Sequence, residues 1–186
     1  MSILDYLGAA AACFAASVHK VNVVRDARLT RLPSDAIGHS VYGHTQMDHF
    51  SCGATAAFTA ICARKYARTG TMPNLTMYHN VWGAVGPDPD NGSTWQDVNR
   101  VLHSRYCRFR APEVRKRLRE GKIVLASVAW PTEAEPDLQH FVVITATAGD
   151  RWLVTNTTCH PGRSQAWVDW AWLRESADDQ CLEFAL

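Results

Sequence analysis

The sequence has no Cys-x-x-Cys pair, no long apolar run and no excess of charge of either sign. Its six cysteines stand apart, at positions 13, 52, 62, 107, 159 and 181. This scatter is typical neither of a zinc site nor of the disulfide framework of a small secreted protein, and we expect no metal and no cofactor. No stretch approaches the roughly 20 apolar residues of a membrane span. The formal net charge of +1 provides no broad basic field, so neither nucleic acid nor a membrane is an expected partner.

Length and composition predict a single domain over residues 1–186 that buries its own core. A chain with 47% apolar residues can do so without disulfides or metals. We expect a reducing compartment, the cytoplasm, with five cysteines filling the core and one acting as a reagent. Delivery into a target cell by a non-classical secretion system is the alternative. Residues 6–16 are Ala-rich but follow an acidic residue, whereas secretory signals begin basic, so residues 3–18 are expected to form a helix packed on the domain.

The first part of the chain carries the spacing of helices. Residues 1–45 are expected to be a helical or irregular lead-in, followed by a helical half over residues 46–120. Ser93, with Gln96 three residues later, is typical of a capping box at a helix start. The helices predicted in this half cover residues 52–66, 76–85, 93–102 and 112–120, and the first stops at Gly70.

After Gly121 the period changes to that of strands, over residues 121–186. β-Branched and apolar residues fill 123–130, 141–147 and 152–157, and Gly149-Asp150 is a turn between the last two runs. Residues 167–173 fit either a helical turn or a strand, and residues 181–186 fit a terminal strand. Helices first and an antiparallel sheet second predict an α+β fold with the functional site between the two halves.

Cys52 has the surroundings of a nucleophile. It stands at the predicted start of a helix, where free N–H groups and the helix dipole favour a thiolate, and Gly53 leaves the adjacent backbone uncrowded. Gln46 precedes it by six residues, so a short bend brings its amide beside the sulfur. That amide and the Cys52 N–H are then candidate donors to the oxyanion of a tetrahedral intermediate.

His140 and Asn156 are the expected partners of this thiol. His140 opens the apolar run that continues with Phe141, and Asn156 closes the next run after a hairpin turn. Both therefore lie near the open end of the hairpin. The Asn156 side-chain oxygen can accept a hydrogen bond from the imidazole and leave its other nitrogen for the thiol. Cys52, His140, Asn156 and Gln46 together predict acyl transfer through a thioester.

These four residues resemble the papain-like cysteine peptidases, which carry a Gln six residues before the catalytic Cys, then a His, then an Asn or Asp. Four stretches resemble the bacterial peptidase C39-like branch, namely residues 46–55, 92–98, 121–124 and 140–144. The resemblance spans most of residues 45–157. It implies a papain-like fold, in which a helical half with the nucleophile at a helix N-terminus packs against a C-terminal antiparallel sheet. It also implies a thiol peptidase that acts on a protein or peptide.

The chain departs from the C39-like pattern after the second strand. That branch usually has Asp-Pro there, whereas this chain reads Asn156-Thr157. An Asn still orients an imidazole but adds no charge. No transporter domain follows in this sequence, so the leader-peptide processing done by exporters is not expected.

Other interpretations of the same residues stay open. The same thioester chemistry serves a glutamine deamidase or transglutaminase-like modifier, such as a bacterial toxin or effector, and a non-catalytic binding module could keep the fold. His44, Asp48 and His49 could ligate a metal but lack a further local ligand, so we expect them to line the approach to Cys52. Cys159 and His160 are adjacent on an extended chain and point apart, so they cannot form a thiol–imidazole pair.

Overall fold

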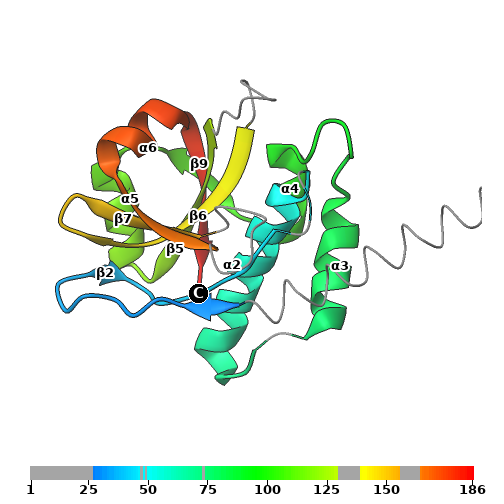
Figure 1. The fold of residues 1–186 in the computed structure, drawn as a ribbon, viewed down its shortest axis with the longest axis horizontal. Coiled ribbons are helices and arrows are strands. Elements are labelled where there is room, and N and C mark those ends of the chain that lie inside the picture. The colour runs from blue at the N-terminus through cyan, green and yellow to red at the C-terminus, as the bar shows by residue number, and fades with distance from the viewer. Residues whose placement is uncertain (1–26, 47, 49, 73, 130–138, 156–163) are drawn as a thin grey trace, which may run out of the picture.

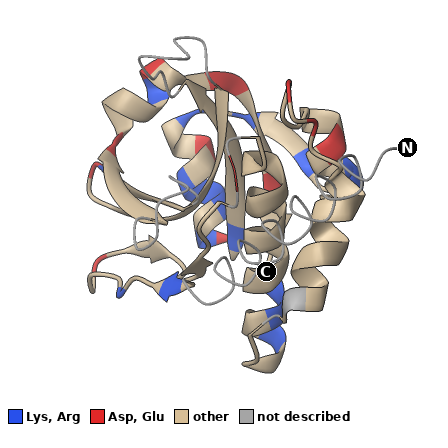
Figure 2. Ribbon diagram, turned by 45° about the vertical axis from the view of Figure 1, so that its right-hand side comes forward, with Lys and Arg blue, Asp and Glu red and all other residues tan. Residues whose placement is uncertain are grey.

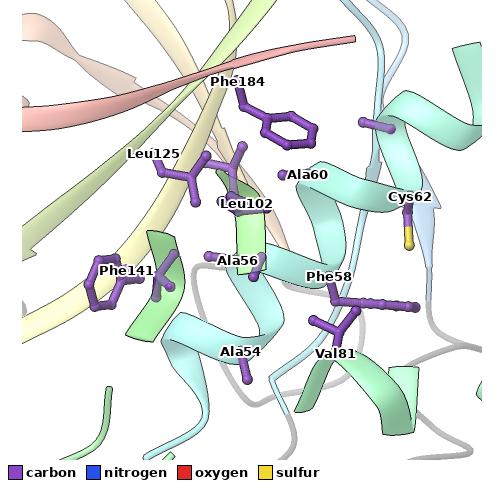
Figure 3. Close-up of a cluster of buried hydrophobic side chains, with 14 of the residues drawn as sticks. Ala54, Ala56, Phe58, Ala60, Cys62, Val81, Leu102, Leu125, Phe141 and Phe184 are labelled. Atoms are coloured by element: carbon purple, nitrogen blue, oxygen red, sulfur yellow. The ribbon is translucent and has the colours of Figure 1, made fainter. Parts of the chain in front are cut away.

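Helix α2 (Cys52–Thr69) is the central element of the helical half. It is rich in alanine, and its first nine residues are all buried. Small side chains let the helix lie close to its neighbours, while Phe58 points toward α3 (Leu75–Val85), which carries Val81 (Figure 3). Phe58 meets Tyr78 of α3 edge-on, with their ring centroids 4.8 Å apart. The helix ends at Gly70, which adopts the left-handed conformation (φ 66°) and donates its N–H to the Tyr66 carbonyl. The helix predicted from Cys52 and its stop at Gly70 are confirmed.

The computed structural model describes residues 27–46, 48, 50–72, 74–129, 139–155 and 164–186. Within these residues an antiparallel sheet has the strand order β4-β9-β5-β6-β7-β8, and β2 pairs with β6. Helices α2, α3 and α4 (Trp95–Leu102) lie on one side of the sheet, whereas α5 (Ala111–Arg119) and α6 (Trp170–Ser176) lie on the other (Figure 1). The strands are β2 (Ile37–Gly38), β4 (Arg105–Arg108), β5 (Lys122–Ala129), β6 (Gln139–Ala148), β7 (Arg151–Thr155), β8 (Gln165–Asp169) and β9 (Ala177–Ala185). The predicted α+β fold class is confirmed.

Alternation along the central strands builds two separate cores. On β6, Phe141 and Val143 belong to the core shared with α2, α3 and α4, whereas Val142 and Ile144 belong to the core shared with α5 and α6. Successive side chains of a strand point to opposite faces, so a strand buried on both faces reads as a continuous apolar run. This explains why residues 141–144 form an unbroken apolar run.

Three features of the fold differ from the sequence-based expectations. Strand β4 comes from the half expected to be helical, yet it forms the edge of the sheet by pairing with β9, and β2 comes from the lead-in. The segment that fitted either a helical turn or a strand contains both, because β8 passes directly into α6. β1 (Arg28–Leu29) and β3 (Tyr42–Gly43) form a small separate pair. The helix expected over residues 3–18 lies outside the described residues.

The capping box of α4 lies one residue later than predicted. Thr94, not Ser93, is the N-cap: its hydroxyl accepts from the Asp97 N–H at 3.2 Å, and the Asp97 carboxylate accepts from the Thr94 N–H at 2.9 Å. The prediction based on Ser93 and Gln96 is therefore wrong. The two patterns overlap in the sequence, and a carboxylate at the positive end of a helix is the stronger acceptor.

Basic and acidic residues are interspersed over the fold, as the net charge of +1 suggests (Figure 2). No helix among the described residues has the length and apolar character needed to cross a membrane.

Candidate active site

The loop before α2 places Cys52 as the first residue of the helix. Asp48 accepts a hydrogen bond from the Phe50 N–H at 3.1 Å, and the Ser51 hydroxyl accepts one from the Asp48 N–H at 3.3 Å. These bonds close a tight turn, and Ser51 then occupies the N-cap position. Cys52 is 6% exposed. The predicted position of the thiol at a helix N-terminus is confirmed.

The Cys52 sulfur meets the start of strand β6. It accepts hydrogen bonds from the backbone N–H groups of Phe141 and Gly53. Along a strand, the N–H and C=O groups of every second residue point to the same side. The Thr155 hydroxyl of β7 donates to the Val143 carbonyl of β6, so the backbone groups of Val143 point toward β7. The Phe141 N–H therefore points toward the β7 side, just past Thr155, where β7 ends. The sulfur lies there, beside the edge of β6.

His140 comes directly before the residue that binds the sulfur. It is 7% exposed and is paired with Val128 of β5. Because consecutive side chains leave a strand on opposite faces, His140 leaves β6 on the face opposite to Phe141. Tertiary structure thus brings Cys52 and His140, distant in sequence, to the same strand end.

The pKa of Cys52 is raised above its ordinary value of 9.0. Burial is the main cause, because it withdraws water from the thiolate, and the Asp48 carboxylate acts in the same direction. The N–H groups of Phe141, Gly53 and Cys52 itself lower the pKa but do not offset the burial. The N–H groups of the helix N-terminus thus favour the thiolate, as expected, but the expectation left out burial, which outweighs them.

Alkylation of Cys52 by iodoacetamide should accordingly accelerate with pH. The thiolate is the reactive form, and a raised pKa leaves less of it at neutral pH than free cysteine has, so the rate should climb about tenfold per pH unit below that pKa. Rates measured by intact mass from roughly pH 6 to 10, with a Cys52→Ala blank, would check this. A rate that stayed flat toward acidic pH would instead demonstrate a thiolate–imidazolium pair.

Gln46 is buried in the segment that leads to α2. Its amide nitrogen donates to the backbone carbonyl of Asp48, and its side-chain oxygen has no hydrogen-bond partner among the described residues. One of the two amide hydrogens is therefore occupied inside the loop, and the other remains for a further acceptor. The loop thus holds Gln46 six residues before the start of α2, with its amide engaged by the backbone of Asp48.

The sequence also singled out residues near the thiol that the structure either places in the core or does not describe. Asn156, His49, Cys159 and His160 lie outside the described residues. His44 is fully buried, with its Nδ1 at 3.1 Å from the Thr59 hydroxyl, and burial lowers its pKa to about 3. His44 is therefore a neutral core residue, and the expectation that it lines the approach to Cys52 is wrong. The described residues contain no cluster of three or more metal-ligating side chains.

A cavity of about 540 Å³ opens beside Cys52. The rings of Trp95 and Phe141 pack in a T-shape with their centroids 4.7 Å apart, and the Trp95 indole N–H donates to Asp178 at 3.3 Å. Ser127 and Gln139 also line the cavity, and the Ser127 hydroxyl donates to the Gln139 side-chain oxygen at 3.1 Å. The cavity is also lined by Phe50 and residues 89–96. It joins the helical half to the sheet, and Cys52 lies in its wall.

Gly53 is required by close packing at this junction. A Cβ atom on Gly53 would lie 2.6 Å from the Ser93 Cβ and 2.9 Å from Val98 Cγ2. The start of α2 therefore touches the start of α4, and any larger residue would push the two apart. The expectation of uncrowded backbone beside the sulfur is wrong, since Ser93 and Val98 take up that space.

Solved structures share the fold of this chain, although no family model and no curated protein matches the sequence. A double glycine motif protease from an AMS/PCAT transporter, solved with the leader peptide, has a TM-score of 0.52 at 18% identity, covering 86% of this chain and 94% of that one. The peptidase domain of Streptococcus ComA, a bifunctional ABC transporter involved in quorum sensing, has a TM-score of 0.54 at 9% identity, covering 76% and 96%. The fold is that of a C39 peptidase domain. A C39-like peptidase from Bacillus anthracis is also similar, at 12% identity over 82% and 98% of the two chains, with a TM-score of 0.47.

Within this C39 fold, sequence reasoning missed most of the cavity lining. Trp95 of α4 was not among the predicted site residues. Another tryptophan, Trp170 of α6, packs on Trp152 in the second core, with their ring centroids 4.8 Å apart. The alternation on β6 does place Gln139 on the same face as Phe141. Ser127 joins that face only through the register of β5 against β6, which the sequence does not reveal.

Proposed function

We propose that this protein is a cysteine peptidase in which Cys52 is the nucleophile and His140 the general base and acid. The observation that carries the proposal is the position of the Cys52 sulfur. It lies at a helix N-terminus, in the wall of a cavity, and is hydrogen-bonded to the residue that follows His140. A thiol, an imidazole and a space for substrate at one point are the parts that acyl transfer requires.

The raised pKa of Cys52 supports His140 as the base of the first step. Because a raised pKa keeps the thiol protonated at neutral pH, the imidazole takes its proton as the sulfur attacks the substrate carbonyl. The Cys52 N–H and the Gln46 amide donate to the resulting oxyanion, and His140 then passes the proton to the leaving amine. Water hydrolyses the thioester and restores the thiol. In this proposal Asn156 accepts a hydrogen bond from the imidazole and holds its tautomer.

A protein or peptide is the proposed substrate. The cavity beside Cys52 is open to solvent and lined by backbone loops as well as side chains, which suits an extended chain. The complex of the double glycine motif protease with a leader peptide supports the same class of ligand. A reducing cytoplasm remains the proposed location.

The test exposes a mixed pool of peptides and proteins to the wild type and to Cys52→Ala, followed by mass spectrometry. New chain ends that appear only with the wild type would support the peptidase. Conversion of glutamine to glutamate, or new isopeptide links without scission, would replace it with a deamidase or transglutaminase-like modifier. If none of the peptides or proteins in the pool were changed by the wild type, a non-catalytic binding module would replace the peptidase.

Gln46→Ala should lower kcat by about a hundredfold with little change in KM, the scale for losing one oxyanion donor. The amide acts on the transition state more than on the bound substrate, so the loss falls on kcat. Steady-state kinetics on a substrate found in the pool experiment would measure it. Gln180→Ala, an exposed position on β9, is the matched control and should be unaffected. If Gln46→Ala kept the same kcat and KM as Gln180→Ala, Gln46 would not be an oxyanion donor.

A further inference from the structure

Two cysteines outside the candidate active site lie side by side on neighbouring strands. Cys107 of β4 and Cys181 of β9 are direct partners in the antiparallel register, and their sulfur atoms are 2.8 Å apart. Cys107 is half-buried, whereas Cys181 is fully buried. This pair is unlike Cys62, which is buried alone on α2.

The backbone geometry at this pair suits a covalent bond. The Phe109 N–H donates to the Asp179 carbonyl at 2.9 Å, so residues 109 and 179 form a hydrogen-bonded pair of the ladder. Pair types alternate along an antiparallel ladder, so Cys107 and Cys181, two residues away, form a pair of the same type. Opposing Cα atoms in such pairs are about 5.5 Å apart, within the roughly 4.4–6.8 Å that disulfides span.

We propose that Cys107 and Cys181 form a reversible disulfide bond that ties the edge strand β4 to β9. The inference is independent of the proposed peptidase activity, because neither cysteine lines the cavity beside Cys52. It also changes the role expected for these two residues, from core filler to a redox-active pair.

The oxidant required is a small disulfide such as oxidised glutathione. The Cys107 thiolate attacks one of its sulfurs, forming a mixed disulfide and releasing one glutathione thiolate, which takes up a proton. Cys181 then loses its proton and attacks the Cys107 sulfur, expelling the second glutathione. Two protein thiols are oxidised and one glutathione disulfide is reduced to two thiols.

The surroundings assign the two roles in this order. The hydrogen bond with Cys181 is the main cause that lowers the pKa of Cys107, and the Arg117 guanidinium acts in the same direction. The same hydrogen bond, together with burial, raises the pKa of Cys181. The half-buried, more acidic thiol of Cys107 therefore meets the oxidant, and the buried thiol of Cys181 needs to reach only the sulfur beside it.

The test uses the full chain in a Cys52→Ala background, so that the candidate nucleophile cannot be oxidised. One sample is treated with oxidised glutathione and another with a phosphine reductant. Both are denatured, alkylated, digested and mapped by mass spectrometry. We expect a linked peptide pair containing Cys107 and Cys181 only after oxidation. Free, alkylated Cys107 and Cys181 after oxidation, or a stable glutathione adduct on Cys107, would overturn the proposal.

Thermal unfolding provides the second readout. Closing a loop between residues 74 apart should raise Tm of the oxidised sample by roughly 10 °C over the reduced one. Cys107→Ser removes a half-buried thiol and should abolish this difference, whereas Cys62→Ala should keep it. A Tm difference that persists in Cys107→Ser would show that another pair of cysteines is responsible.

Discussion

Replacing Cys52 by alanine should lower the turnover of any peptide substrate by at least about a thousandfold, because no other group can form the thioester. The fold should persist. Cys52 packs in a core of alanines on α2, and its replacement removes a single sulfur atom whose hydrogen bonds come from backbone N–H groups. The destabilisation should be about 1 kcal/mol, typical of a conservative core change. Product formation and thermal unfolding would be measured on the same preparations.

Cys62→Ala is the matched control for this variant. Cys62 lies on the same helix, is 2% exposed and belongs to the same core. It should therefore lose a similar amount of stability while retaining full activity. A Cys52→Ala protein that still forms product would contradict the assignment of the nucleophile. A Cys62→Ala protein that loses activity in step with its stability would show that the effect is structural.

His140→Ala should lower kcat by roughly a hundred- to ten-thousandfold, the range for losing a general acid–base group. The raised pKa of Cys52 makes this loss large at neutral pH, because little thiolate forms without a base beside the sulfur. As pH rises toward the thiol pKa, more thiolate forms unaided, so the gap between variant and wild type should narrow. Profiles of kcat against pH for both proteins would check the size and the direction.

His103→Asn is the control for His140. His103 is exposed at the end of α4 in the left-handed conformation (φ 51°), which Asn tolerates. It should leave the pH profile unchanged. The double variant Cys52→Ala, His140→Ala should be no slower than Cys52→Ala alone, because the two groups act in one step. A further multiplicative loss would indicate that His140 acts apart from the thiol.

The helix that begins at Cys52 and the strands around His140 were predictable because their signals are local. Alanine spacing and Gly70 set the limits of α2, and β-branched runs mark β5, β6 and β7. The pairing of β4 with β9 was not predictable. It joins residues 105–108 to residues 180–183, and a strand of only four residues carries no pattern that selects its partner strand.

Part of the candidate site was likewise predictable from the sequence, and part was not. Spacing to Cys52 and the resemblance to C39-like peptidases pointed to Gln46 and His140, and the structure places Cys52 and His140 at one strand end. The pKa of Cys52 could not be predicted, because a helix N-terminus favours the thiolate while burial opposes it. Which effect prevails depends on how many atoms surround the sulfur, and this follows from packing alone.

The sequence by itself determined which side chains can do chemistry and where the longer helices and strands lie, since both depend on residue type and on neighbours within a few positions. Tertiary structure decided the rest. It set Phe141 against the Cys52 sulfur, Trp95 across the cavity and Cys107 opposite Cys181, three contacts that depend on strand register and helix packing. Strand register and helix packing depend on burying the apolar side chains of both cores at the same time, so no local sequence pattern encodes them.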